Sequence, residues 1–299
     1  MAPGFPYSRT RQSAHQGARP ALRVLSLGVC LIAASATSLR AQAERQWMTL
    51  LRAHDFARLE EQTVLFQKHF ADGHITELEL RDAYRPFYDM NEDDWRRLDL
   101  WQTAYPKSYA VPLIRGAFYK RAGFDARGGE WADETSDAQF KEMYRLHELA
   151  RYQLLASLEL TEKPFLSVWH LLDVVYGDSL AMRDLLDAGT RMLPTNTLIR
   201  SRYMRKLTPR WYGSYPLMEE FLAYARETGA TERGLWELEA IIDDDAGDMA
   251  IRNGDKATAI ELFRKALELG AKAGGEVPQE LRYSWYWRCH LPELKAFCR

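Results

Sequence analysis

The stretch GDKATAIELFRKALEL, residues 254–269, has the most regular pattern in the chain. Its apolar positions recur at the spacing of one helix face: Ala259, Ile260, Phe263, Ala266 and Leu267. Glu261 and Lys265 stand four residues apart on another face, where opposite charges stabilise a helix. Because the apolar face alternates small and aromatic side chains, a neighbouring helix can approach it closely. The stretch therefore predicts a helix packed against a second helix.

This helix resembles the second helix of a tetratricopeptide repeat. The positions that match the repeat pattern are Gly254, Ala259, Phe263 and Ala266, with Gly247 where the first helix carries its glycine. The match ends after Gly270, because Ala271 replaces the expected proline. The best match covers residues 240–273 and implies a helical hairpin that stacks on its neighbours.

Weaker helical patterns fill most of the remaining chain. Degenerate hairpin signals lie at 156–164, 185–194 and 218–229, and further helices are predicted at 55–71, 75–88, 93–104, 108–122 and 137–159. Ser136 and Gln139 form a capping-box pattern in front of the last of these. No alternating run predicts a strand. We therefore expect an all-α fold of antiparallel helical hairpins stacked as a TPR-like solenoid, a single domain over 44–299 that ends in a C-terminal hairpin at 280–299.

Four stretches also resemble the bacterial domain-of-unknown-function family 4034. They are HDFARLEEQ (54–62), ELRDAYRPFY (79–88), RGGEWADETS (127–136) and PRWYGSY (209–215), and the resemblance extends over roughly residues 46–270. Tyr212 stands where the family pattern often has a second glycine. The resemblance implies an exported or envelope-associated helical-repeat protein, and it implies no particular reaction.

The N-terminus has the pattern of a Sec-type signal peptide. Residues 1–43 contain no acidic residue, and their basic residues are Arg9, Arg11, Arg19, Arg23 and Arg40. An apolar run from Val24 to Leu39 leads into the small-residue motif Ala41-Gln42-Ala43. This pattern predicts cleavage after Ala43 and a periplasmic or secreted protein with no transmembrane span. The alternative is an uncleaved anchor, although the run is short for a membrane span.

Charge and cysteine content indicate which partners are expected and whether a disulfide forms. The chain has 40 basic and 42 acidic residues, and cleavage would remove five arginines, so nucleic acid is not an expected partner. Cys289 and Cys298 remain after cleavage. In an oxidising compartment this pair is expected to form a disulfide, the alternative being two free thiols.

No linear catalytic or cofactor motif is present. Nucleotide-binding glycine loops and the G-x-S-x-G elbow are absent. HELAR, residues 147–151, begins like a zinc-protease motif but has Arg151 where the second histidine would stand. The sequence therefore predicts no cofactor and no metal, and it favours a binding protein over an enzyme.

Two groups of polar residues have a structural and a functional interpretation. The acidic run Asp243, Asp244, Asp245 and Asp248 lacks the spacing of a calcium loop, so it is interpreted as a solvated helix face. His170 stands beside Trp169 and Asp173 in an apolar stretch. It is either a core or groove residue or a catalytic base.

Two loops have residues that suit a binding site. The connection from Gly123 to Thr135 contains Arg127, Trp131 and Glu134, and long connections in compact domains are often functional.

The second loop is PRWYGSY. Pro209 ends the preceding helix, Gly213 permits a positive φ and Ser214 can cap the helix that begins at Tyr215. Arg210, Trp211 and Tyr212 have no such architectural role, so they are candidates to bind a carboxylate, a sugar or an acidic partner. The structural alternative is an ion pair between Arg210 and Glu134 or Asp133, with Trp211 packed under its own hairpin.

Two functions follow from these patterns. The first is an exported adaptor that binds a protein or peptide through the concave surface of a helical repeat. The second is an envelope enzyme or small-ligand receptor with a pocket formed by loops 123–136 and 209–215. That second function requires Arg127, Glu134 and Arg210 to converge with His170 around one cavity.

Overall fold

A computed structural model describes residues 46–129, 134–176, 179–211, 213–274 and 281–298. The described chain contains helices and no strands, in agreement with the predicted all-α class. After helical residues 46–52, the elements are α2 (Phe56–Ala71), α3 (Glu77–Tyr84), η1 (Arg85–Asp89), α4 (Glu92–Ala104), α5 (Ala110–Arg127), α6 (Asp137–Ser157), α7 (Phe165–Val174), α8 (Ser179–Met192), α9 (Leu198–Lys206), η2 (Pro209–Trp211), α10 (Tyr215–Glu227), α11 (Glu232–Arg252), α12 (Lys256–Gly274), α13 (Arg282–His290) and η3 (Pro292–Phe297).

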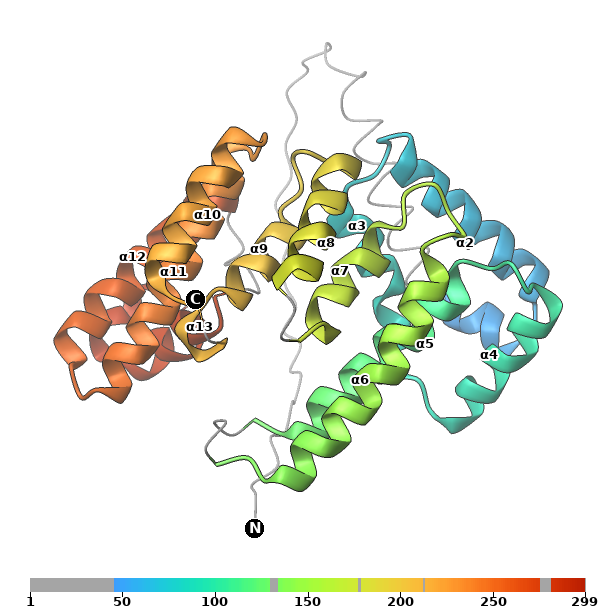
Figure 1. The fold of residues 1–299 in the computed structure, drawn as a ribbon, viewed down its shortest axis with the longest axis horizontal. Helices are drawn as coiled ribbons and strands as arrows, with labels where there is room; N and C mark the ends of the chain where they lie inside the picture. Colours follow the sequence, from blue (N-terminus) through green and yellow to red (C-terminus); the bar gives the residue numbers. More distant parts are fainter. Residues whose placement is uncertain (1–45, 130–133, 177–178, 212, 275–280, 299) are drawn as a thin grey trace, which may run out of the picture. The chain divides into compact units, whose positions relative to one another are not determined.

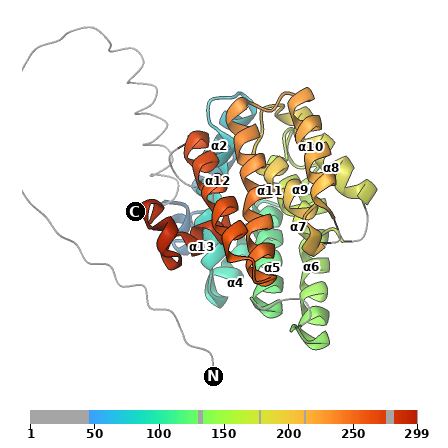
Figure 2. The same cartoon turned by 90° about the vertical axis from the view of Figure 1, so that its left-hand side faces the viewer.

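Two pairs of helices lie side by side along their lengths, α5 with α6 and α11 with α12 (Figures 1 and 2). Glycines allow this close packing. A Cβ atom at Gly116 of α5 would lie 2.5 Å from Leu154 Cγ of α6. One at Gly247 of α11 would lie 2.6 Å from the Phe263 ring of α12. The contact between Gly247 and Phe263 agrees with the hairpin expected from the repeat-like pattern.

The core follows the chain from Trp47 to Leu281 as one cluster of buried side chains. Trp47 packs against Phe66, Tyr84 and Phe87, with ring centroids 5.2–6.2 Å apart. A smaller cluster, formed by Ala259, Phe263, Leu291 and Leu294, lies under the C-terminal residues. There a disulfide joins Cys289 to Cys298 with their Cα atoms 5.1 Å apart, so the predicted pairing is confirmed.

Most of the predicted helices are confirmed, whereas the hairpin signal at 156–164 lies mainly on the connection between α6 and α7, and one predicted loop is misplaced. The capping box at Ser136 and Gln139 is confirmed at the start of α6. The connection predicted to begin at Gly123 is wrong, because α5 continues to Arg127. Gly123 is buried inside this helix against the His147 ring of α6. The helix ends instead at Gly128, which has a φ of +82° and donates its N–H to Phe124 O.

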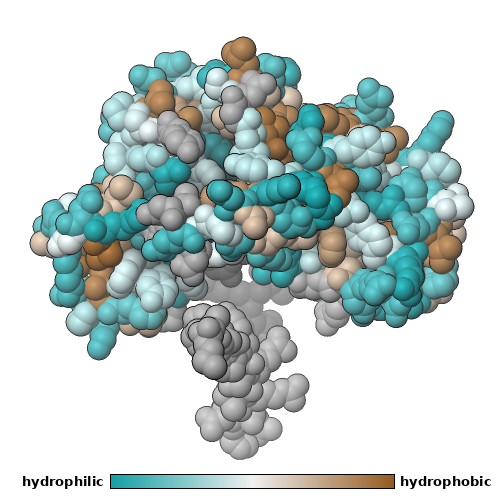
Figure 3. All heavy atoms as spheres, turned by 60° about the horizontal axis from the view of Figure 1, so that its bottom comes forward, coloured by the Kyte–Doolittle hydropathy of each residue, from teal (hydrophilic) through white to brown (hydrophobic). Residues whose placement is uncertain are grey.

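On the face drawn in Figure 3, small groups of hydrophobic residues are set among hydrophilic ones. Within the ranges that the structure describes, no helix has both the length and the apolar character needed to span a membrane. The predicted leader, residues 1–43, lies outside the described residues.

Candidate functional site

The candidate site is built around α7, whose sequence FLSVWHLLDV is apolar except at a few positions. Every residue of this helix except Asp173 is buried, because α7 packs against α5, α6, α8 and α9. Within this apolar environment Asp173 forms two ion pairs through Oδ2, with Lys120 Nζ of α5 at 2.9 Å and Arg202 Nη1 of α9 at 3.0 Å. Charges this poorly hydrated persist only when they are paired.

A third cation lies beside Asp173. Lys206 of α9 places its Nζ 3.4 Å from the Asp173 backbone oxygen. The same ammonium lies 5.1 Å from the centroid of the Tyr176 ring and 5.2 Å from that of the Trp211 ring, within the range of cation–π attraction. Among the described residues, the Asp173 carboxylate pairs with Lys120, whereas Lys206 contacts the Asp173 backbone oxygen, so the two lysines share one nearby carboxylate and leave an excess of positive charge.

The Trp169 indole orders the cations around Asp173. Arg202 Cζ lies 3.6 Å from the centroid of this ring, and Lys120 Nζ lies 5.4 Å from it. Arg202 also donates from Nη1 to the Trp169 backbone oxygen at 2.8 Å. Stacking of this kind fixes a planar guanidinium while leaving its edge available for hydrogen bonds.

The shared environment changes the ionisation of these groups. Burial lowers the pKa of Lys120 to about 8, although Asp173 opposes this shift. Burial also disfavours the Asp173 carboxylate, but Arg202, Lys120 and Lys206 outweigh it and hold the pKa of Asp173 well below its ordinary value. At neutral pH Asp173 is therefore ionised and Lys120 is largely protonated.

Two neutral histidines complete the polar cluster. Burial lowers the pKa of His147 to about 4, and burial together with Lys120 and Arg202 lowers that of His170 well below its ordinary value. His147 Nε2 lies 3.0 Å from the Lys120 carbonyl oxygen and must donate to it. The neutral ring then accepts at Nδ1 from the Tyr176 hydroxyl, 2.5 Å away.

His170 has one unpartnered nitrogen. Its Nε2 lies 3.1 Å from the Tyr88 hydroxyl oxygen, whereas its buried Nδ1 has no hydrogen-bond partner among the described residues. If Tyr88 donates to Nε2, the proton on Nδ1 has no acceptor. If Nε2 donates instead, the Tyr88 hydroxyl hydrogen has no acceptor in the pair. In either tautomer one donor of the pair is left for an acceptor from elsewhere.

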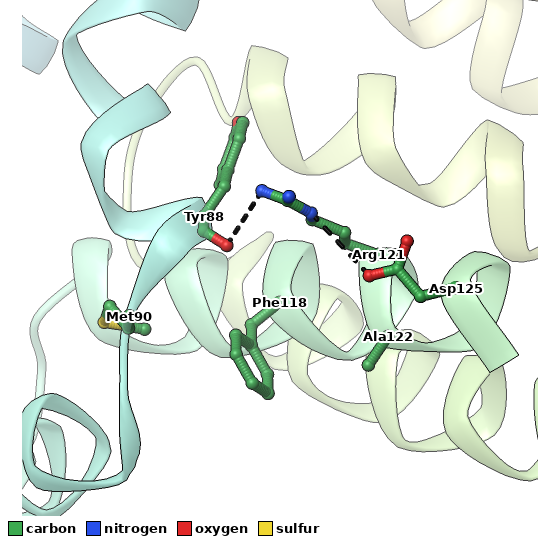
Figure 4. A pocket seen from close by; sticks show the side chains of 6 residues that line it. All are labelled: Tyr88, Met90, Phe118, Arg121, Ala122 and Asp125. Carbon is green, nitrogen blue, oxygen red and sulfur yellow. Dashed lines mark hydrogen bonds and ion pairs between the residues drawn. The ribbon is translucent and has the colours of Figure 1, made fainter. Parts of the chain in front are cut away.

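A cavity of about 160 Å³ lies beside these groups. We refer to it as the Lys120 cavity, and it is lined by Tyr88, Ala117, Lys120, Arg121, Phe124 and His170. A more open hollow of about 300 Å³, the Phe118 depression, is lined by Tyr88, Met90, Phe118, Arg121, Ala122 and Asp125 (Figure 4). Since Tyr88 and Arg121 line both, the two spaces adjoin.

Of the site residues predicted from the sequence, His170 lines the Lys120 cavity. Arg127 lies at the end of α5 with its guanidinium 5.8 Å from the centroid of the Phe140 ring, and Glu134 is exposed. Trp131 and Tyr212 lie outside the described residues.

Arg210 of the PRWYGSY corner is directed to α11. Its Nε lies 2.7 Å from Asp245 Oδ1, its Nη2 lies 3.1 Å from Asp248 Oδ2, and its guanidinium stacks 4.5 Å from the centroid of the Tyr283 ring. The described contacts therefore do not bring Arg210 together with His170. Trp211 does reach the cluster, through its contact with Lys206.

The interpretation of the acidic run as a solvated helix face is wrong, because all four carboxylates are buried. Asp243 pairs with Lys265 at 3.1 Å, and Asp245 and Asp248 hold Arg210. The fourth, Asp244, accepts from Ser284 N and Oγ at 2.6 Å and so satisfies the start of α13. The partners of this run are distant in sequence, which is why local spacing did not indicate them.

Sequence reasoning also missed Tyr88, Lys120, Arg202 and Lys206. Asp173 itself was an indication, because a carboxylate in a largely apolar, buried helix requires a nearby cation. Which cation it would be depends on how α5, α7 and α9 pack together. Within the described ranges, no cluster of three or more His, Cys, Asp or Glu side chains has the arrangement of a metal site.

Comparison with known proteins adds no relative, since no family model, curated protein or solved structure matches the chain. The resemblance to domain-of-unknown-function family 4034 accordingly stays a prediction.

Proposed function

We propose that this chain is a helical-hairpin binding protein that recognises an anionic group of its ligand at the Lys120 cavity. The observation that carries the proposal is the excess of buried positive charge beside a cavity. Lys120 pairs with the Asp173 carboxylate, the one carboxylate of the described residues at this cluster, while Lys206 contacts the Asp173 backbone oxygen, and Lys120 lines the cavity. Arg202 pairs with the same carboxylate and makes further contacts.

An anion in the cavity would improve the electrostatics of the site. A buried cation without a full counter-charge is costly, and a second anion would offset that cost. When His170 Nε2 donates to the Tyr88 oxygen, the Tyr88 hydroxyl hydrogen is left to donate to a negatively charged oxygen in the cavity. Both features favour the same kind of ligand group.

We propose that the chain is exported and acts as an adaptor for a protein or peptide. A leader pattern at residues 1–43 and the Cys289–Cys298 disulfide support an oxidising compartment outside the cytoplasm. The antiparallel pairs α5–α6 and α11–α12 support a TPR-like repeat architecture, of the kind that binds proteins or peptides. The small-ligand receptor is the alternative, with the Lys120 cavity in place of a pocket between loops 123–136 and 209–215.

Isothermal titration calorimetry on residues 44–299 tests the proposal with acetate, benzoate and phosphate at constant ionic strength. We expect at least one of these anions to bind, and Lys120→Met to weaken that binding about tenfold or more. The matched control is Lys141→Met, which removes an exposed lysine of α6. Binding that is equal in both variants would contradict the proposal.

The pH dependence provides a second test. Lys120 must be protonated to attract an anion, so affinity should fall as pH rises through about 8. Asp173 keeps its charge over pH 6–9, because the neighbouring cations hold its pKa well below its ordinary value. Burial lowers the pKa of Lys206 as well, so loss of the Lys206 proton would weaken anion binding in the same direction. His147 and His170 are neutral throughout the range. An affinity that does not change between pH 6 and pH 9 would exclude Lys120 as the anchor.

A further inference from the structure

We infer that the Lys120 cavity takes the carboxylate of an apolar monocarboxylate, either a small aryl or alkyl acid or the last residue of a polypeptide with an apolar side chain. This inference rests on the proposed function, and it specifies the ligand by size, by charge and by the apolar surface around it.

The size of the cavity limits the ligand to a small group. Its volume of about 160 Å³ is below the ~300–1,000 Å³ of pockets for drug-sized molecules. A protein cavity of ~150 Å³ is known to hold benzene. A single ring or a short alkyl chain with one carboxylate therefore suits this space, whereas a nucleotide or an oligosaccharide does not.

The charges favour a monoanion. With Arg202 left aside, two lysines against one carboxylate leave an excess of a single positive charge. Arg121, the other cation of the lining, donates to the Tyr88 backbone oxygen at 3.1 Å and lies 3.8 Å from Asp125 (Figure 4). Phosphate sites usually present a fork of guanidinium donors or a row of backbone N–H groups. The polar residues that line this cavity are instead one lysine, one arginine that contacts the Tyr88 backbone oxygen and Asp125, and the Tyr88–His170 pair.

The remaining lining is apolar. Ala117 and Phe124 of α5 border the Lys120 cavity, and Phe124 is held edge-on against His147 with ring centroids 4.7 Å apart. Beyond Tyr88 and Arg121, the Phe118 depression continues with the apolar Met90, Phe118 and Ala122 and with the charged Asp125. A longer ligand would place its carboxylate near Lys120 and its apolar body along this depression.

Calorimetry with matched ligands tests the inference. Benzoate and hexanoate should bind to residues 44–299, whereas benzamide, hexanamide and phosphate should bind at least about tenfold more weakly. A peptide that ends in phenylalanine, with a free or an amidated C-terminus, separates the two sources. Binding of the free acid peptide more tightly than benzoate would indicate a chain terminus, and the reverse would indicate a small acid.

Two variants connect the binding to the site. Lys120→Met should abolish the preference for acid over amide, whereas Lys141→Met should retain it. If Lys120→Met does not fold, Tyr88→Phe serves instead, because it removes the hydroxyl alone and should weaken benzoate about tenfold.

The two proposals fail in different ways. Phosphate binding that depends on Lys120, without benzoate binding, would overturn the monocarboxylate and leave the anion site standing. Equal binding of acid and amide, or no Lys120-dependent binding of any anion, would overturn both.

Discussion

Asp173 stabilises the folded protein by neutralising the cations that pair with its carboxylate. Its carboxylate is the contact between α7 and two cations, Lys120 and Arg202, which belong to α5 and α9. Removing one member of a buried ion pair leaves the others without a counter-charge, and this costs more than the pair itself contributes. The same residue therefore stabilises the packing of three helices and sets the charge of the candidate site.

For Asp173→Asn we expect the free energy of unfolding to fall by about 3 kcal/mol, because Lys120 and Arg202 then lack their carboxylate. Urea denaturation monitored by circular dichroism measures the change. Asp99→Asn is the matched control, since the Asp99 carboxylate is 61% exposed where it pairs with Arg115. Its effect should stay within about 1 kcal/mol. Equal effects of the two variants would show that the pairs of Asp173 contribute no more than a surface ion pair.

The buried carboxyl group of Asp244 makes the free energy of unfolding depend on pH, and its pKa shift gives the direction of the change. Burial raises its pKa from 3.8 to about 6, although Ser284 donates to the carboxylate. The folded state therefore prefers the protonated carboxyl. This stabilising contribution is complete below the unfolded value of 3.8 and is lost as pH rises through about 6. From pH 4 to pH 7, the stability of the parent relative to Asp244→Asn should fall by on the order of 2 kcal/mol.

Denaturation at pH 4, 5.5 and 7 measures this difference, with Asp255→Asn as a control of opposite sign. The hydrogen bond from Thr258 lowers the pKa of the exposed Asp255, so its contribution is lost as pH falls. Parallel pH profiles for the parent and Asp244→Asn would contradict the assignment.

The corner between α9 and α10 is connected to α11 by Arg210. Its ion pairs with Asp245 and Asp248 span 35 and 38 residues of sequence. Ser214 caps α10 as predicted, and Gly213 lies so close to the Leu207 backbone that a Cβ would clash with it. The arginine of PRWYGSY thus has an architectural role that local spacing does not indicate, because its partners belong to another helix.

Arg210→Ala should lower the free energy of unfolding by about 3 kcal/mol, since it leaves two buried carboxylates without their cation. Adding Asp245→Asn and Asp248→Asn should recover part of the loss. A thermodynamic cycle over the parent, the single variant, the double Asn variant and the triple variant isolates the interaction. Arg226→Ala, at an exposed arginine of α10, should change stability by no more than about 0.5 kcal/mol. If Arg210→Ala costs the same with and without the aspartates, the ion pairs do not hold this corner.

At the scale of the whole molecule, helical periodicity predicted the fold class and most helices, because apolar spacing and caps are local signals. It failed at Gly123, where a glycine that resembles a helix end is required for close packing on His147. Of the residues suggested by the sequence, His170 lines the Lys120 cavity and Trp211 contacts Lys206. Lys120, Arg202 and Lys206 were not predicted, since they are ordinary surface residues by local pattern. Tertiary packing alone brings their charges to Asp173.

The last prediction concerns the processed chain. Trp47 and Leu51 are buried in the core, so cleavage after Ala43 would leave the folded part intact. Protein exported from the full-length sequence should therefore have the mass of residues 44–299 less two hydrogen atoms, because Cys289 and Cys298 are joined. Intact mass spectrometry under non-reducing conditions measures both features together. Cys289→Ser is the control, since it should restore the hydrogen at Cys298 and allow one alkylation. A mass that includes residues 1–43 would favour the uncleaved anchor, and a doubly alkylated parent would show that the disulfide does not form in the exported protein.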